Sequence, residues 1–409
     1  MAEAPLAPPD AAPPSRDARI IALIGTGHFL SHFYMLCLPP LFLTWRDEFG
    51  VSFAELGLAV ALMSAVTAAL QTPVGFLVDK HGARPFLVGG TLLMALSISA
   101  MAFAPGYWAI LLLAVTSGIG NSVIHPADYA ILSGSISKER MGRAFAIHTF
   151  NGNLGFAVAP PMMVWLAAAL GWRGSLLLVG LLGIPLVLAI LFQSRILNDQ
   201  AKPKADAGAA GGRALLMTRP MLLFFTFFLL SSMAGGGVQS WLITVLHTVH
   251  GLDLGSASSA LTAYMVGATA GVLVGGYFAD RIGNHLMFAS VAVLLAAGLV
   301  LVVGLVSLPG AVVIGLMLGG GTALGTSRTP RDMMVRDASP PGQIGKVFGF
   351  VSAGLPLGGA LTPVPFGWLI DHGRPDLVLV LVAAILVVSL FCAGGARAAH
   401  RARVAVAAE

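Results

Sequence analysis

Charged residues are scarce in this chain of 409 residues: they make up 10% of it, against about 25% in a soluble domain. Hydrophobic residues make up 57%, and the mean hydropathy is +0.87. Such a chain cannot cover itself with a water-compatible surface, so the composition indicates an integral membrane protein. The two cysteines, Cys37 and Cys392, lie inside apolar stretches, which rules out a disulfide framework or a cysteine metal site.

Sequence motifs for nucleotides and metals are also missing. The phosphate-binding loop G-x-x-x-x-G-K-S/T does not occur, so ATP hydrolysis on this chain is excluded. His28 and His32 have the i, i+4 spacing of zinc-binding helices, but the acid of an H-E-x-x-H motif is absent. No carboxylate cluster for a hard cation is present either. We therefore expect no metal and no cofactor.

Twelve apolar segments approach the roughly 20 residues that a membrane-spanning helix needs. They cover residues 20–43, 53–78, 85–103, 107–133, 142–170, 174–194, 220–247, 256–279, 285–306, 311–335, 345–370 and 377–395. The composition predicts a disordered tail at 1–18, a six-helix half at 19–195, a linker at 196–218, a second six-helix half at 219–396 and a tail at 397–409.

The formal net charge of +5 reflects where lysine and arginine lie along the chain. Of the 23 such residues, only Arg46, Arg173 and Arg374 fall in loops on one side of the spans, and Arg328 lies within a span. All others fall on the opposite side. By the positive-inside rule, both termini are cytoplasmic, and the basic excess is a topology signal rather than a nucleic-acid footprint.

The two halves are related by an internal repeat. Residues 75–82 (GFLVDKHG) match residues 276–283 (GYFADRIG) at an offset of 201. Residues 142–145 (GRAF) match residues 345–348 (GKVF) at an offset of 203. An almost constant offset over this distance indicates a duplicated six-helix unit, which is typical of transporters.

Residues 75–84 resemble motif A of the major facilitator superfamily, G-x-L-x-D-K/R-x-G-x-K/R. The motif positions are filled by Gly75, Leu77, Asp79, Lys80, Gly82 and Arg84. The second copy has Asp280 and Arg281, but Asn284 and His285 stand where a basic residue is usual. We therefore expect the second copy to hold the two halves together more weakly than the first. His125-Pro126, followed by residues 142–144 (GRA) and 152–156 (GNLGF), resembles the fosmidomycin-resistance-like branch.

The resemblance implies an all-α integral membrane fold of twelve helices in two pseudo-symmetric six-helix bundles. In motif A, Asp79 would face a helix N-terminus, and Lys80 and Arg84 would form contacts that must break when the two halves move apart. The motif therefore predicts a gate. The alternative is that these are only topology-setting loop charges. The expected gating residues are Gly75, Asp79, Lys80, Gly82, Arg84, Asp280, Arg281, Arg331 and Asp332.

Ionisable residues inside the bilayer are functional-site candidates because their insertion costs at least ~2.5 kcal/mol. His125 and Asp128 share one helix face, and the repeat maps them onto Arg328 and Arg331. Arg328 carries a planar fork that suits carboxylate or phosphonate. Arg328 either binds an anionic substrate or forms a permanent structural pair with Asp128.

The remaining candidates are polar residues within other spans. Asn151 is predicted either to bind substrate or to join neighbouring helices, and Trp241 is expected to anchor at the membrane interface. The substrate-binding candidates are Arg328, His125, His28, His32, Tyr34, His148, Asn151, Gln239 and Tyr264. The candidates for proton coupling are Asp128, His125 and His32, because histidine titrates near neutral pH.

The sequence therefore predicts a secondary active transporter, not an enzyme, that moves a small anionic organic molecule by alternating access with proton coupling. The alternative is a proton-driven multidrug or fosmidomycin-like efflux pump. A membrane enzyme or a non-transporting sensor is a remote alternative. Expected partners are the small-molecule substrate, protons and the lipid bilayer, with no nucleic acid. We expect a monomeric, multi-pass protein of a bacterial inner membrane.

Overall fold

Eleven helical stretches in the part of the chain that the structure describes are long and apolar enough to cross a membrane. The computed structural model describes residues 14–136, 138–197, 215–279, 281–339, 347 and 350–408, and their regular structure is helical throughout. The longest element, α7 (Lys138–Leu181), breaks at Gly171, where φ is +69° and ψ is 167°. Glycine tolerates positive φ because it has no β-carbon. This turn divides α7 into two spans, which agrees with the twelve expected from the sequence.

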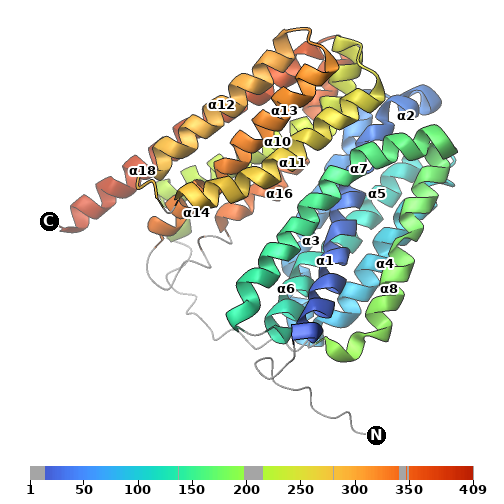
Figure 1. Ribbon diagram of the computed structural model, residues 1–409, viewed down its shortest axis with the longest axis horizontal. Coiled ribbons are helices and arrows are strands. Elements are labelled where there is room, and N and C mark those ends of the chain that lie inside the picture. The colour runs from blue at the N-terminus through green and yellow to red at the C-terminus, as the bar shows by residue number, and fades with distance from the viewer. Residues whose placement is uncertain are drawn as a thin grey trace, which may run out of the picture. The chain divides into compact units, whose positions relative to one another are not determined.

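The chain divides into two units by its internal contacts (Figure 1). The first comprises residues 1–49 and 62–205, and the second comprises residues 50–61 and 206–409. The first unit contains α1 (Pro14–Leu36), the short 3₁₀ helix η2 (Pro39–Leu41), α2 (Phe42–Phe49), most of α3 (Phe53–His81), α4 (Ala83–Met101), α5 (Tyr107–Asn121), α6 (Ile124–Ser135), α7, α8 (Gly183–Phe192) and η3 (Ser194–Ile196). The second contains the start of α3, α10 (Arg219–His250), α11 (Leu254–Ala279), α12 (His285–Leu305), α13 (Gly310–Thr326), α14 (Arg328–Asp337), α16 (Gly354–Leu361), α17 (Pro363–Asp371) and α18 (Asp376–Ala408).

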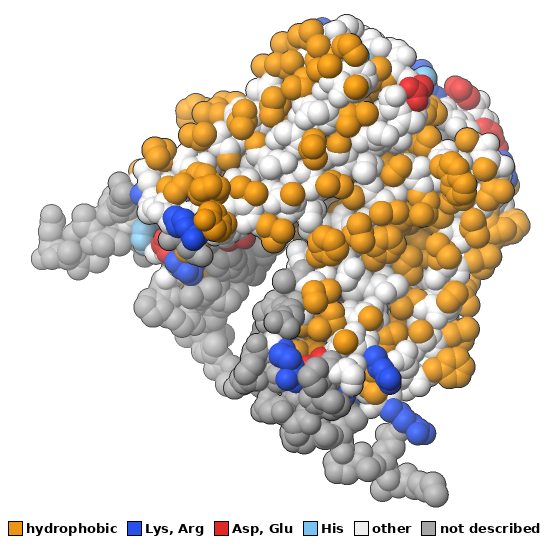
Figure 2. All heavy atoms as spheres, in the orientation of Figure 1, with side chains coloured by type: hydrophobic (Ala, Val, Ile, Leu, Met, Phe, Trp, Pro, Cys, Tyr) orange, Lys and Arg blue, Asp and Glu red, His pale blue; other side chains and the backbone are white. Residues whose placement is uncertain are grey.

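Large apolar side chains lie on the outside of both units. Phe192 and Trp108 in the first unit are 84% and 78% exposed, and Leu273 and Phe391 in the second are each 75% exposed. Figure 2 shows such side chains covering the visible sides of the helices, with lysine and arginine near helix ends. An outer surface of this kind is stable against lipid and not against water, so the chain is a multi-pass membrane protein.

Three helix interruptions occur at prolines, which lack the N–H that an α-helix needs. α1 ends at Leu36 and Pro39 opens η2, so the regular α-helix stops short of the end of the expected span at residue 43. Pro126 is the third residue of α6, and Pro330 is the third residue of α14. Neither residue can donate to the carbonyl four positions earlier, so α5 and α6, and likewise α13 and α14, are separate helices. Each pair still forms one apolar stretch long enough to cross a membrane, as expected for residues 107–133 and 311–335.

Close backbone contacts hold the first unit together around α1. α1 packs on α6 and α7, and a β-carbon at Gly155 of α7 would lie 2.2 Å from the carbonyl oxygen of Phe29. Directly after the turn at Gly171, Trp172 and Arg173 both donate hydrogen bonds to the carboxylate of Glu48 at the end of α2. These contacts fix the positions of α1, α6 and α7, which carry the site described below.

A glycine seam joins α11 and α13 in the second unit. We define it as Gly267, Gly271 and Gly275 of α11 with Gly321 and Gly325 of α13. A β-carbon at any of the five would lie 2.0–2.3 Å from a carbonyl oxygen of the facing helix. Small residues at four-residue spacing let membrane helices approach this closely. The seam therefore makes α11 and α13 one tightly packed pair (Figure 1).

The first turn of α3 is capped from two directions within the second unit. Ser52 and Glu55 form a reciprocal cap, with Ser52 N donating to Glu55 Oε2 at 2.8 Å and Glu55 N to Ser52 Oγ at 3.2 Å. The Asp371 carboxylate at the end of α17 accepts from the backbone N–H of Phe53 at 2.7 Å and of Ala54 at 2.8 Å. An acid at a helix N-terminus satisfies amides that have no intrahelical partner.

Candidate functional site

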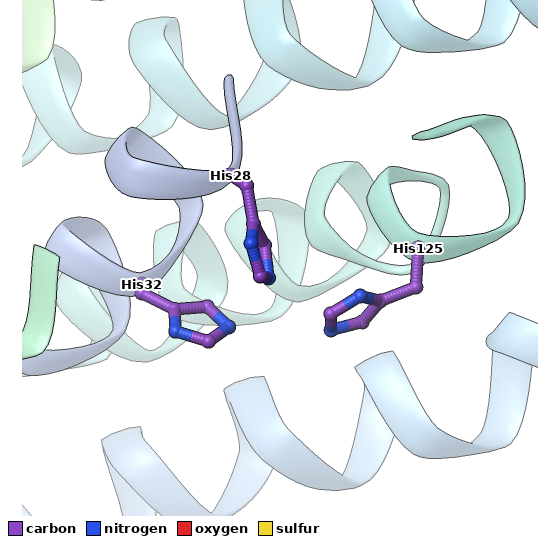
Figure 3. Close-up of side chains that lie close together, drawn as sticks. All are labelled: His28, His32 and His125. Carbon is purple, nitrogen blue, oxygen red and sulfur yellow. The ribbon is translucent and has the colours of Figure 1, made fainter. Parts of the chain in front are cut away.

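Four histidines gather in the first unit. We call them the histidine cluster: His28 and His32 from α1, His125 from α6 and His148 from α7. The His28 ring stacks on that of His148 with a centroid distance of 3.8 Å and an interplanar angle of 4°. The ring centroids of His32 and His125 lie 4.3 Å and 5.0 Å from that of His28. The structure thus brings together all four histidines that the sequence analysis selected inside the spans, and Figure 3 shows three of them converging.

Asp128 of α6 is part of this cluster and is fully buried. Its Oδ2 lies 2.9 Å from Nε2 of His148, which is also fully buried. Its Oδ1 has no hydrogen-bond partner among the described residues. A buried carboxylate with an imidazole partner can hold or release a proton without leaving an isolated charge in the membrane.

Asp128 and His148 are separated by 20 positions and lie on different helices. Both were candidates on the sequence, but nothing in their spacing pairs them. The pairing depends on α6 and α7 packing together with α1.

Tyr34 and Asn151 take part in helix packing. The Tyr34 hydroxyl is buried and lies 3.1 Å from the carbonyl oxygens of both Val179 and Gly180, to which it donates. Asn151 lies against α1, since a β-carbon at Gly25 would be 2.4 Å from its amide nitrogen. For Asn151 this contact corresponds to the helix-joining alternative, and its substrate-binding alternative stays a prediction.

Arg328 is the first residue of α14 in the second unit. It is half-buried, and no carboxylate in the described part of the second unit forms an ion pair with it. Tyr264 of α11 is buried and close enough to Arg328 for the two to interact electrostatically. Gln239 of α10 is half-buried. An arginine without an acidic partner at this depth is suited to binding an anion.

The expectation that Trp241 anchors at the membrane interface is wrong. Its side chain is completely buried in the second unit, where Nε1 donates to the Pro363 carbonyl at 3.0 Å. The ring meets Phe53 edge to face at a centroid distance of 5.9 Å. Because every part of the indole has a protein partner, the residue packs α10 against α17 and α3 instead of contacting lipid headgroups.

The motif A residues are described only in part. Asp280 and the side chain of Asp79 lie outside the described residues. Gly75 is in α3, Lys80 is exposed near its end, and Gly82, with φ at +87°, immediately precedes α4. Arg84 donates to the carbonyl oxygen of Ser194 at 3.0 Å, which ties α4 to the end of the first unit.

The second copy of the motif has a different set of contacts. The guanidinium of Arg281 lies 3.7 Å from the Tyr277 ring centre. Asn284 caps α12 and accepts from Arg397 of α18 at 2.5 Å. Arg331 pairs with the adjacent Asp332 at 3.0 Å and lies over the ring of Phe228 at 3.9 Å.

Comparison with known proteins adds sequence and structural relatives. The profile of the Major Facilitator Superfamily matches residues 24–261 and 245–405. The chain is 26% identical over 254 residues to a probable L-galactonate transporter of Escherichia coli, covering 58% of this chain and 56% of that protein. It is 25% identical over 371 residues to the fosmidomycin resistance protein of Escherichia coli, covering 89% of each.

Among solved structures, a bacterial homolog of the human lysosomal transporter Spinster, in an inward-facing and occupied conformation, matches with a TM-score of 0.75. The match is 14% identical and covers 97% of this chain and 96% of that one, so it bears on the fold alone. A duplicated chain of twelve apolar spans with polar side chains buried among them has the architecture of a membrane transporter. The chain belongs to the Major Facilitator Superfamily.

Proposed function

We propose that this transporter moves a small organic anion across the membrane by alternating access, coupled to protons. The observation that carries the proposal is Arg328, a half-buried cation without an ion-pair partner among the described carboxylates of the second unit. Arg328 is the first residue of α14, directly after the interruption that separates this helix from α13. Broken membrane helices whose N-termini face an anionic group are a recurrent substrate site in transporters.

The names of two relatives support an anionic substrate. Galactonate carries a carboxylate and fosmidomycin carries a phosphonate, and a guanidinium binds either through two parallel hydrogen bonds. We infer that Tyr264 and Gln239 of the second unit complete the contacts to the substrate. Uptake of an organic acid and efflux of a fosmidomycin-like compound run in opposite directions, so the direction of flux separates an uptake transporter from the alternative of an efflux pump.

Asp128 is the proposed proton carrier, with His148 as its hydrogen-bond partner. It is completely buried, and its Oδ1 has no partner among the described residues, so protonation costs no existing hydrogen bond there. The motif A residues, with Arg331 and Asp332, are the proposed gate, since Arg84 already links α4 to the Ser194 carbonyl. We place the protein, as a monomer, in a bacterial inner membrane with both termini in the cytoplasm.

The test of the anion site compares the unmodified protein with two arginine variants against a panel of carboxylates and phosphonates that includes L-galactonate and fosmidomycin. Ligand-induced thermal stabilisation identifies the probe, and titration of that probe gives its affinity. Arg328→Lys keeps the charge and loses the fork, so affinity should fall at least about tenfold, equivalent to about 1.4 kcal/mol. Arg336→Gln, on the exposed face of the same helix, is the matched control and should bind normally.

Two results would refute the anion proposal. One is binding of neutral or cationic compounds with no response to any anion in the panel. The other is an Arg328→Lys protein with the affinity of the Arg336→Gln control. Coupling is tested separately in proteoliposomes, where an imposed pH gradient should drive uptake by the unmodified protein and should have no effect on Asp128→Asn. A flux that follows a sodium gradient instead would exclude protons as the coupling ion.

A further inference from the structure

Three imidazoles of the histidine cluster converge on one point within the first unit (Figure 3). His28 and His32 lie one turn apart on α1, and His125 reaches them from α6. One ring nitrogen from each lies within 4.8 Å of the other two. A tetrahedral zinc ion with Zn–N bonds of about 2.0–2.1 Å holds its nitrogens about 3.3 Å apart. Small rotations of the two half-buried rings, His32 and His125, would close this difference.

The same three side chains hold buried nitrogens without a hydrogen-bond partner among the described residues. They are Nε2 of His28, Nδ1 of His32 and Nδ1 of His125. Buried polar atoms in folded proteins nearly always have a partner, so an isolated one needs an explanation. Each of these three rings therefore has a nitrogen that the described residues leave without a partner.

The tautomer of His28 is fixed by its surroundings. Its Nδ1 lies 2.7 Å from the carbonyl oxygen of His148, which accepts hydrogen bonds only, so Nδ1 carries the proton. The Nε2 lone pair is therefore free. A metal-binding histidine almost always donates its second ring nitrogen to a carbonyl or carboxylate, because that bond orients the ring. His28 already has this arrangement.

The chemistry and the space around the rings select the class of ligand. Imidazole nitrogens suit Zn²⁺, Co²⁺, Ni²⁺ and Cu²⁺, whereas Mg²⁺ and Ca²⁺ need oxygen ligands, and the nearby carboxylate of Asp128 is held by His148. Gly152 of α7 faces the rings, and a β-carbon there would lie 2.5 Å from Cε1 of His28 and 2.9 Å from Cε1 of His32. Glycine at this position leaves the rings free to close on an ion.

We propose that His28, His32 and His125 form a binding site for one divalent transition-metal ion, with Zn²⁺ the best match to three neutral imidazoles. The expectation of no metal rested on α1 alone, where His28 and His32 lack the acid of the zinc-protease motif. The third ligand comes from α6, which only the fold brings to α1. Three protein ligands leave the fourth tetrahedral position open for water or another small ligand.

The test uses the purified full-length protein in detergent, with any histidine tag removed and with metal stripped by a chelator. Co²⁺ serves as a spectroscopic probe because tetrahedral Co²⁺ absorbs in the visible range, and competition with Zn²⁺ gives the Zn²⁺ affinity. We expect one equivalent of Co²⁺ per chain. His125→Phe and His32→Phe keep the ring volume and remove the ligand atoms, so each should weaken Zn²⁺ binding at least about tenfold.

His81→Ala and His372→Ala are the matched controls, since both side chains are exposed and lie outside the cluster. They should bind one equivalent with unchanged affinity. Thermal unfolding of each variant without metal confirms that it is folded. Absence of stoichiometric binding to the unmodified protein overturns the proposal, and so does unchanged affinity in a folded His125→Phe protein. If both phenylalanine variants fail to fold, the spectrum of Co²⁺ bound to the unmodified protein decides. A spectrum that shows nitrogen ligands supports the proposed site, and a spectrum that shows none overturns it.

Discussion

Replacing Gly321 by alanine probes the glycine seam directly. The new β-carbon would lie 2.0 Å from the carbonyl oxygen of Tyr264 and 2.8–2.9 Å from its C and Cα atoms. A carbon and a carbonyl oxygen in contact stay about 3.3 Å apart or more, so α11 and α13 must separate by about 1.3 Å. All three atoms are backbone, so no side chain can rotate away to relieve the contact.

The stability cost follows from this geometry. Overpacking of a well-packed interior costs about 1–3 kcal/mol. At roughly 2–4 °C per kcal/mol for a unit of this size, Gly321→Ala should lower the Tm by about 2–12 °C. A thiol-reactive dye can report the transition, because the chain contains two free cysteines and Cys37 is fully buried until the protein unfolds.

Gly315 supplies the control on the same helix. A β-carbon there meets no atom within 4 Å, and alanine favours a helix over glycine by about 1 kcal/mol. Gly315→Ala should therefore keep or raise the Tm. If the Tm of Gly321→Ala equals that of Gly315→Ala, the two helices are not in the close contact described, and the reasoning is refuted.

Three further predictions concern turns and caps, each measured by the same thermal assay. Gly171→Ala should lower the Tm, since alanine at a φ of +69° costs about 1–2 kcal/mol; an unchanged Tm would mean that the helix does not break there. Asp371→Ala removes the acceptor for Phe53 N and Ala54 N and should cost about 1 kcal/mol, whereas a Tm equal to that of the unmodified protein would exclude the cap. Hydrogen bonds from Ser256 lower the pKa of Asp253. The ionised carboxylate therefore stabilises the fold above the ordinary aspartate pKa, and this stabilisation is lost as the pH falls through the lowered pKa. The Tm difference between Asp253→Ala and the unmodified protein should shrink in acid, and a difference that does not change with pH would contradict this prediction.

The fold was largely predictable because its signals are local. Hydrophobic length alone located the spans, and the spacing between residues 170 and 174 anticipated the turn at Gly171. The breaks before α6 and α14 lie inside two of these spans, and apolar length alone does not register the N–H that Pro126 and Pro330 each lack.

The candidate site was predictable as a set of residues but not as a set of contacts. Burying a histidine or an acid in a membrane is costly, so composition alone marks His28, His125 and Asp128. Which of them touch depends on how α1, α6 and α7 pack, and that depends on glycine contacts distributed over distant positions. The pairing of Asp128 with Arg328 stays a prediction, while the bond between Asp128 and His148 had no sequence signal.

The turn at Gly171 limits how the topology of this protein can be mapped. Two spans meet there with almost no loop between them, and the next two residues, Trp172 and Arg173, are bonded to Glu48. An inserted epitope, cleavage site or glycosylation acceptor would have to displace those bonds, and a protease could not reach the backbone without them opening. Failure to label this position would therefore be no evidence that it is cytoplasmic. Reporters belong instead in the turn between α17 and α18, where His372, Gly373 and Arg374 are all exposed.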